Sequence, residues 1–248
     1  GSINRTGASG SFYCYYNLGS PTSGSENIQN NNFSNITVTG SSSLYGIYSY
    51  TSTSVSTRTC SGNILSNWIG GTGSTYGYYL LSTIDNNIYN NIFYHVNVGG
   101  AVYALRFTGT NPNVYNNIIS DITTSGSSVY GIYDAGTGIS QVYNNQVNKL
   151  FSNATSVTMD GIYITGATTN YVFNNIVGEL KVPFSGSTIG LVGIYISGGS
   201  SIGLYYNTVY LDATSTGTNF GSSAVSVSTT PVIEMINNIF VNNSTPNG

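Results

Sequence analysis

Eight carboxylates are the side chains with the widest chemical range in this 248-residue sequence. Paired carboxylates can act as general acid and base on a glycosidic bond, and clustered carboxylates can bind calcium. Here they are spread along the chain, and no third carboxylate joins any pair in its register. We therefore expect no catalytic residues and a non-enzymatic protein. The eight are Glu26, Asp85, Asp121, Asp134, Asp160, Glu179, Asp212 and Glu234.

One pair of acids follows the repeat described below. Asp121 and Glu179 occupy the same position two repeats apart, and Lys149 occupies it in the repeat between them. Such an acidic, basic, acidic stripe is either a binding site or a way for stacked repeats to avoid repulsion between like charges. The sequence favours the second interpretation, a column of ion pairs.

Neither a metal site nor a cofactor site is expected. His95 is the only histidine, and it shares its repeat position with Asn35 and Asp121, which favours a polar surface residue over a general base. Cys14 and Cys60 lack the CxxC spacing of metal or redox sites. Two small buried side chains are a simpler interpretation of these cysteines than a disulfide.

Composition argues against two classes of partner. Charged residues make up 5% of the chain, with 5 Lys+Arg, 8 Asp+Glu and a formal net charge of −3, whereas soluble domains contain roughly 25% charged residues. The basic stripe of a nucleic-acid-binding protein is missing. No apolar run approaches the roughly 18 residues of a membrane span. The 40% of hydrophobic residues suffices for a folded core, so the surface must consist of neutral polar groups.

A repeated asparagine motif sets the elements that position these side chains. It occurs in "VYNNIISDI" (114–122), "VFNNIVGEL" (172–180) and "EMINNIFVNN" (234–243). The steps between equivalent asparagines are 32, 28, 26, 28, 30, 32 and 31 residues, which indicates one structural unit repeated along the chain. The column consists of Asn31, Asn63, Asn91, Asn117, Asn145, Asn175, Asn207 and Asn238.

Short strands alternate with this motif. Each opens on a small residue followed by an apolar one, and strand alternation predicts that the apolar residue points inward and its neighbours outward. A further apolar column precedes the asparagines by three residues. Because no stretch has a helical period, we expect an all-β fold of parallel strands stacked rung on rung. The small residues are Gly46, Gly77, Ala104, Gly131, Gly161, Gly193 and Ala224.

The asparagines themselves have a structural interpretation. Asparagine tolerates the left-handed backbone angles of a sharp bend, and its amide both donates and accepts hydrogen bonds. Stacked about 4.8 Å apart, identical amides can bond to one another along the column. We therefore expect an internal asparagine ladder formed by the eight residues of the column.

Two aromatic columns are expected on the outer surface. They either stabilise neighbouring strands by stacking or form a contact face for glycans or for another copy of the chain. Arg106 interrupts the first column. The first column is Tyr48, Tyr79, Tyr133, Tyr163 and Tyr195, and the second is Tyr89, Tyr115, Tyr143, Phe173 and Tyr205.

Three segments carry a family resemblance. "GIYDAGTGISQVYNNQV", "GIYITGATTNYVFNNIV" and "GIYISGGSSIGLYYNTV" resemble the GIY…NN-x-[IV] coils of right-handed parallel β-helix repeat proteins. "NNIFVNNSTPNG" is similar to repeats of large secreted surface proteins of the Bacteroidetes and related bacteria. The resemblance implies a right-handed parallel β-helix of about eight coils of roughly 30 residues each, a hand that parallel crossovers generally prefer. It also implies an extracellular or cell-surface location, but little about chemistry.

These features lead to one domain and two candidate functions. Residues 1–248 are expected to form a single β-helix domain, with an irregular or partial first coil at 1–25 and a partial last coil at 231–248. Neither end carries the polar cap that solenoids normally need. We favour a structural or adhesive module that stacks end to end with copies of itself into a filament or belongs to a larger surface protein. The alternative is a pectate-lyase-like β-helix that binds or cleaves polysaccharide.

A third function ranks below these two. The segment "TSTSVSTRT" (51–59) is rich in threonine, as ice-binding surfaces are. No regular threonine array extends across the repeats, so an ice-binding surface is not favoured.

Overall fold

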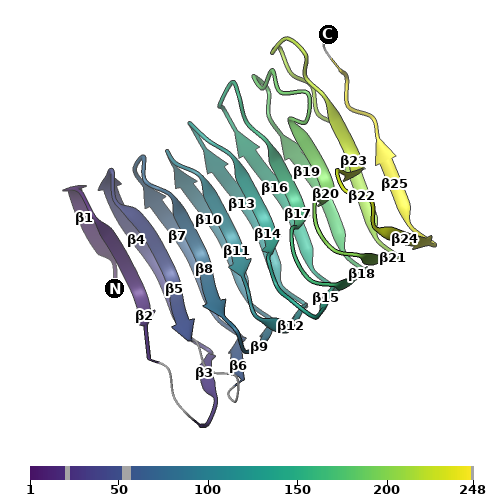
Figure 1. Ribbon diagram of the computed structural model, residues 1–248. Helices are drawn as coiled ribbons and strands as arrows, with labels where there is room; N and C mark the ends of the chain where they lie inside the picture. The colour runs from purple at the N-terminus through teal and green to yellow at the C-terminus, as the bar shows by residue number, and fades with distance from the viewer. Residues whose placement is uncertain (20–22, 52–56, 247–248) are drawn as a thin grey trace.

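The chain forms a parallel β-solenoid. The computed structural model describes residues 1–19, 23–51 and 57–246, and within these ranges it contains β-strands and no helix. The strands belong to three sheets, and neighbouring strands run parallel in each. Figure 1 shows them stacked side by side from the purple N-terminal strand to the yellow C-terminal one. The predicted all-β solenoid is confirmed.

Each turn adds one strand to each sheet, so sequence neighbours lie in different sheets and strands three apart are paired. Sheet A comprises β1 (Ile3–Ala8), β4 (Asn32–Gly40), β7 (Ile64–Gly70), β10 (Ile92–Val98), β13 (Ile118–Thr124), β16 (Gln146–Ser152), β19 (Ile176–Lys181), β22 (Thr208–Leu211) and β25 (Ile239–Asn242). Sheet B comprises β2 (Ser11–Asn17), β5 (Ser43–Thr51), β8 (Thr75–Ser82), β11 (Val102–Phe107), β14 (Val129–Asp134), β17 (Met159–Ile164), β20 (Leu191–Ile196) and β23 (Ser222–Val227). Sheet C comprises β3 (Glu26–Gln29), β6 (Arg58–Ser61), β9 (Asp85–Tyr89), β12 (Thr110–Tyr115), β15 (Ile139–Tyr143), β18 (Thr169–Phe173), β21 (Ser201–Tyr205) and β24 (Val232–Ile236).

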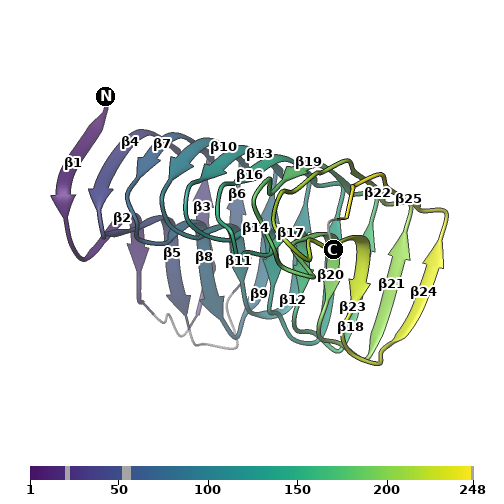
Figure 2. The same ribbon diagram turned by 90° about the horizontal axis from the view of Figure 1, so that it is seen from above.

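The three sheets form separate walls around one interior. Seen from above in Figure 2, the strands of each sheet follow one another along the length of the solenoid. Residues 3–8 and 11–17 belong to this arrangement as β1 and β2, which pair with β4 and β5. The outer faces of the three walls are therefore the surfaces on which functional side chains can gather.

The asparagine ladder lies at the corner between sheets C and A, and its prediction is confirmed. The side-chain amide of each asparagine donates to the side-chain oxygen of the asparagine one rung further on, at 2.9–3.1 Å. The same oxygen accepts the backbone N–H of the preceding asparagine. The second amide hydrogen goes to a main-chain carbonyl of the rung before, as from Asn145 to Val114. From Asn63 to Asn207 these side chains are at most 2% exposed, so an interior column of polar groups is fully paired.

The left-handed bend lies at the residue before each ladder asparagine, and its prediction at the ladder asparagine is wrong. The residue with positive φ is the one before the ladder residue, as in Asn90, Asn116, Asn144 and Asn174 with φ of 54–56°. Gly62 holds the same position with φ of 64°. The ladder residues themselves do not have positive φ. The paired asparagines therefore have two separate roles, because the first turns the chain and the second bonds along the stack.

Strict alternation is also wrong at the glycine of sheet B. Gly131 and Ile132 are both buried, and the strand pairing passes over the glycine. A side chain at Gly131 would lie 2.6 Å from Val147 Cγ1, and one at Gly161 would lie 2.4 Å from Val177 Cγ1. Side chains from sheet A therefore pack directly on the backbone of sheet B, which is why this column holds glycine or alanine.

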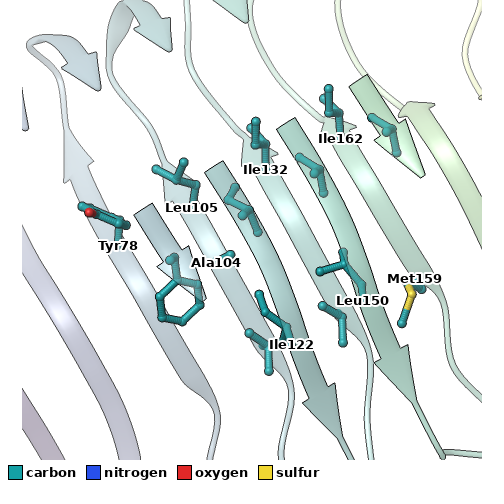
Figure 3. Packing of buried hydrophobic residues seen from close by; sticks show 14 of the residues in the cluster. Tyr78, Ala104, Leu105, Ile122, Ile132, Leu150, Met159 and Ile162 are labelled. Carbon is teal, nitrogen blue, oxygen red and sulfur yellow. The ribbon is translucent and has the colours of Figure 1, made fainter. Parts of the chain in front are cut away.

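The core consists of apolar columns. Figure 3 shows Tyr78, Leu105, Ile132 and Ile162, which succeed one another in register on β8, β11, β14 and β17. Ile122 and Leu150 from sheet A face them across the interior. These six side chains are at most 1% exposed. Because the rungs are evenly stacked, equivalent residues of successive repeats lie next to one another. An apolar residue at the same position of every repeat therefore builds a continuous core.

Replacing Asn145 by alanine should destabilise the solenoid strongly. The backbone N–H and side-chain amide of Asn117 lose their acceptor, and the Val114 carbonyl loses its donor. Each buried polar group left unpaired costs about 1–3 kcal/mol, so we expect the free energy of unfolding to fall by roughly 3 kcal/mol or more. Urea unfolding followed by circular dichroism measures this loss.

Asn144→Gly is the matched control, because it changes the first asparagine of the same pair. Asn144 has φ of 54°, which glycine adopts without steric cost. We expect the free energy of unfolding to stay within about 0.5 kcal/mol of the wild-type value. A large loss for Asn144→Gly together with a small one for Asn145→Ala would contradict the two roles assigned to the pair.

Candidate functional site

The first candidate site is a polar column on the outer face of sheet A. Four residues after the ladder asparagine, six of the eight rungs carry an exposed residue with φ of 52–60°, at which the strand pairing is interrupted. Left-handed angles are unfavourable for lysine and glutamate, so the surrounding rungs must impose this backbone conformation at Lys149 and Glu179. The column is Asn35, Asn67, His95, Asp121, Lys149 and Glu179.

The side-chain contact in this column differs from the expected ion pairs. His95 Nε2 lies 2.8 Å from Asp121 Oδ2, and both side chains are about half exposed. Among the described residues no ion pair within 4.0 Å joins Lys149 to Asp121 or Glu179. The prediction that His95 belongs to the same column is confirmed, whereas the alternation of Asp121, Lys149 and Glu179 does not produce contacts between them.

Two hollows follow one another along this face. One of about 430 Å³ is lined by His95 and Asp121, and one of about 330 Å³ by Asp121, Lys149 and Glu179. Asp121 lines both, so together they form a shallow groove across the rungs. Asp121 and Glu179 are two rungs apart, about 10 Å at the usual strand spacing. In the described part of the chain no group of three or more His, Cys, Asp or Glu side chains is arranged to hold a metal ion.

A second candidate surface is the tyrosine face of sheet B. The predicted column of Tyr48, Tyr79, Tyr133, Tyr163 and Tyr195 lies there, joined by Tyr16. Sequence reasoning missed a parallel column beside it. The signal was the tyrosine that precedes the glycine or alanine of most repeats, as in "YGIY". The second column is Tyr13, Tyr45, Tyr76, Tyr103 and Tyr130.

On sheet B the faces of the tyrosine rings are covered by the rings of neighbouring rungs. Rings of neighbouring rungs stack with centroids 4.8 Å apart from Tyr45 to Tyr76 and 4.9 Å apart from Tyr76 to Tyr103. Arg106 does not break the face, because its guanidinium lies 5.0–5.2 Å from the centroids of Tyr79, Tyr103 and Tyr133. Ring edges and hydroxyls are therefore turned to solvent. A sugar that needs an open ring face finds little of it here.

The aromatic column of sheet C is stacked as far as Phe173. Tyr89, Tyr115, Tyr143 and Phe173 form parallel pairs with centroids 4.6–4.9 Å apart. Tyr205 follows in register but does not continue the stack; its nearest ring partner is Tyr171 at 6.5 Å. The predicted column is thus interrupted at its last member.

The two cysteines are free thiols. Cys60 is buried, and burial raises the pKa of the half-buried Cys14 thiol to about 12, so neither is a ready nucleophile. Residues 52–56 of the threonine-rich segment lie outside the described residues.

Three other carboxylates are structural. Glu26 accepts from Arg58 Nε at 2.7 Å and from Asn17 at 2.7 Å. Burial acts to raise the pKa of Glu26, but these hydrogen bonds hold it below its ordinary value. Burial raises the pKa of Asp134 to about 6, although Gly136 N and Ser140 Oγ donate to it. Burial raises the pKa of Asp160 to about 7, and its Oδ1 is buried without a hydrogen-bond donor.

Comparisons with protein-family models, with curated proteins and with solved structures find no match to this sequence. No related protein therefore supports the predicted likeness to surface-protein repeats, and the function must be argued from the geometry. In the described residues no helix is long and apolar enough to cross a membrane.

Asp160 should make the protein less stable as the pH rises. A carboxyl whose pKa is raised on folding destabilises the folded state when it ionises, and the loss develops between about pH 4, the ordinary pKa of aspartate, and about pH 7. Asp160→Asn removes this ionisation. We expect the variant to melt several degrees above wild type at pH 8 and at the same temperature as wild type at pH 4.

Asp212→Asn serves as the control, since Asp212 is exposed. Its melting temperature should follow that of wild type at both pH values. Equal melting of wild type and Asp160→Asn at pH 8 would show that the Asp160 carboxylate is not destabilising.

Proposed function

We propose that the protein is a non-enzymatic structural module of an extracellular or cell-surface assembly, which extends by stacking a further β-solenoid rung on its C-terminal rung. The observation that carries the proposal is an apolar core column that emerges at this rung. Met235 is 58% exposed, whereas Leu204 directly beneath it in the same column is 0% exposed. On sheet A, Phe240 is partly exposed, whereas Val209 beneath it is 0% exposed. An apolar surface of this kind is stabilised by covering it with another rung.

The asparagine ladder gives this contact a direction. Every ladder residue donates to the next rung, so Asn238 has backbone and side-chain donors that point past the last strand. At the other end the side-chain oxygen of Asn31 receives no donor from a preceding ladder residue within the described chain. Donors at one end and an acceptor at the other are complementary. They favour a head-to-tail contact between copies, which repeats without closing.

The sheets constrain how copies stack. Sheet A has nine strands and sheets B and C have eight each within the described residues. A second copy shifted by eight rungs would continue the ladder from Asn238 to Asn31, but its β1 would fall on the position of β25. One of these two strands must therefore leave its place when copies join. The low charge of the chain opposes such a contact little.

A second candidate function is the binding or cleavage of a polysaccharide. The groove on sheet A favours it, because His95, Asp121, Lys149 and Glu179 line two adjoining hollows. Against cleavage, the Asp121 carboxylate already contacts His95 Nε2 at 2.8 Å. The geometry supports the structural role better.

We expect the protein to form rods in electron micrographs whose lengths grow with concentration in steps of about 38 Å, eight rungs at the usual strand spacing. Met235→Lys places a charge on the exposed core column and should leave single particles. Ile139→Lys is the control, since Ile139 is 49% exposed on the outer face of sheet C in the middle of the stack. Wild-type protein that stays as single particles at every concentration would contradict stacking between copies, as would unchanged rods of Met235→Lys.

We also expect no release of reducing ends from neutral or acidic polysaccharides by the wild-type protein. Asp121→Asn and Glu179→Gln test whether any measured cleavage depends on the groove of sheet A. If cleavage is measured, and if either substitution abolishes it while Asp212→Asn does not, the structural proposal is wrong and the groove is an active site.

A further inference from the structure

The stack on sheet C stops one ring early. Tyr89, Tyr115, Tyr143 and Phe173 lie face to face with interplanar angles of 2–7°. Their spacing of 4.6–4.9 Å equals the rung spacing of a parallel sheet. The next ring in this column should lie over Phe173, because Tyr205 is its partner in register.

Tyr205 instead turns into the neighbouring column. Its hydroxyl donates to Glu234 Oε2 at 2.6 Å, and its ring lies over the backbone of Gly203. A Cβ on Gly203 would be 2.5 Å from the ring carbon Cε2 and from the hydroxyl oxygen of Tyr205. The absence of a side chain at this position therefore allows the ring to leave the stack.

A pocket of about 280 Å³ occupies the position that Tyr205 has left. It is lined by Tyr171, Phe173, Asn174, Tyr205 and Tyr206. Four of the five are aromatic, and the amide of Asn174 is the one non-aromatic side chain. Tyr115 and Tyr143 have a ring on both faces, whereas Phe173 has, among the described residues, a stacked ring on the Tyr143 side alone.

Three departures from the repeat meet at this pocket. Tyr171 stands where the two preceding rungs have Gln141 and Asn113, and Gly203 follows Tyr171 in the same column. Tyr206 has φ of 57° at a position that is asparagine or glycine in the other rungs. A bulky side chain is strained at such an angle, and strain of this kind is often kept at binding sites. No packing in the core requires these exchanges, because all three lie on the outer side of the wall.

We propose that this pocket binds a small planar aromatic molecule, which lies on Phe173 and completes the stack in place of Tyr205. A planar ring matches the height of one rung, since neighbouring rings in this column are less than 5 Å apart. A sugar ring fits less well, because its hydroxyls would find few partners among the aromatic walls. The net charge and the nearby Glu234 favour a neutral ring over an anionic one.

Gly203→Ala tests the proposal, because the new methyl group displaces the Tyr205 ring toward Phe173 and closes the pocket from within. The probe is indole, titrated and followed by saturation-transfer NMR, with cyclohexanol and methyl glucoside as non-aromatic probes. Indole should bind saturably and the other two should not. Gly203→Ala should weaken indole binding by about tenfold or more, the loss expected when a ring contact of about 1.4 kcal/mol is removed.

Gly178→Ala is the matched control, since a Cβ there meets only the carbonyl oxygen of Tyr210, at 3.3 Å, on sheet A. It should bind indole within about twofold of wild type. Equal binding of indole and cyclohexanol, or wild-type affinity in a folded Gly203→Ala, overturns the proposal.

A second variant applies if Gly203→Ala fails to fold. Phe173→Leu removes the ring face and should give the same loss of indole binding; unchanged affinity overturns the proposal. A Gly-Trp-Gly peptide that binds more tightly than indole would assign the pocket to a partner's side chain and overturn it as well.

Discussion

One hydrogen-bonded column sets the register of the whole solenoid. Within the ladder each asparagine from Asn63 to Asn207 receives two hydrogen bonds from the rung before and gives two to the rung after, counting its backbone N–H. A slip of one residue would turn every inward side chain to the other face and leave these buried amides unpaired. A slip would incur both costs at once, the exposure of apolar side chains and the loss of buried hydrogen bonds. The ladder therefore fixes where the sheets, the core columns and the outer columns begin in every repeat. The outer chemistry of the molecule follows from that alignment.

Equal register makes the outer faces columns of like residues, and this limits what they can do. Tyrosines on sheet B stack on one another, so they stabilise neighbouring rungs with the faces that a ligand would otherwise use. Charged side chains gather instead on the outer face of sheet A, at residues with left-handed backbone angles. The positions of greatest interest are those where the repeat is broken. Tyr205 leaves its column on sheet C, and the core column ends at Met235.

The repeat itself could be predicted from sequence because it rests on residue identity at fixed spacing. The ladder members and the solenoid followed from eight asparagines. The roles within the asparagine pair could not be separated, since both members are asparagine in most repeats and only the backbone angles distinguish Asn144 from Asn145. The second tyrosine column was missed because the strand pairing passes over the glycine. Two outward tyrosines such as Tyr130 and Tyr133 are therefore three residues apart, whereas strict alternation would place outward residues two apart. Tyr205 was expected in the stack, because a hydrogen bond to Glu234 on the next rung has no signal in a column pattern.

Hydrogen exchange of the asparagine side-chain amides, measured by NMR on protein labelled with ¹⁵N-asparagine, tests the central role of the ladder most directly. The amides of Asn63, Asn91, Asn117, Asn145, Asn175 and Asn207 should exchange slowly, as expected for groups that open only with the solenoid. The amides of the bend residues Asn90, Asn116, Asn144 and Asn174 should exchange fast. Uniformly fast exchange in both sets would contradict the account, because the column would then not hold the rungs in register.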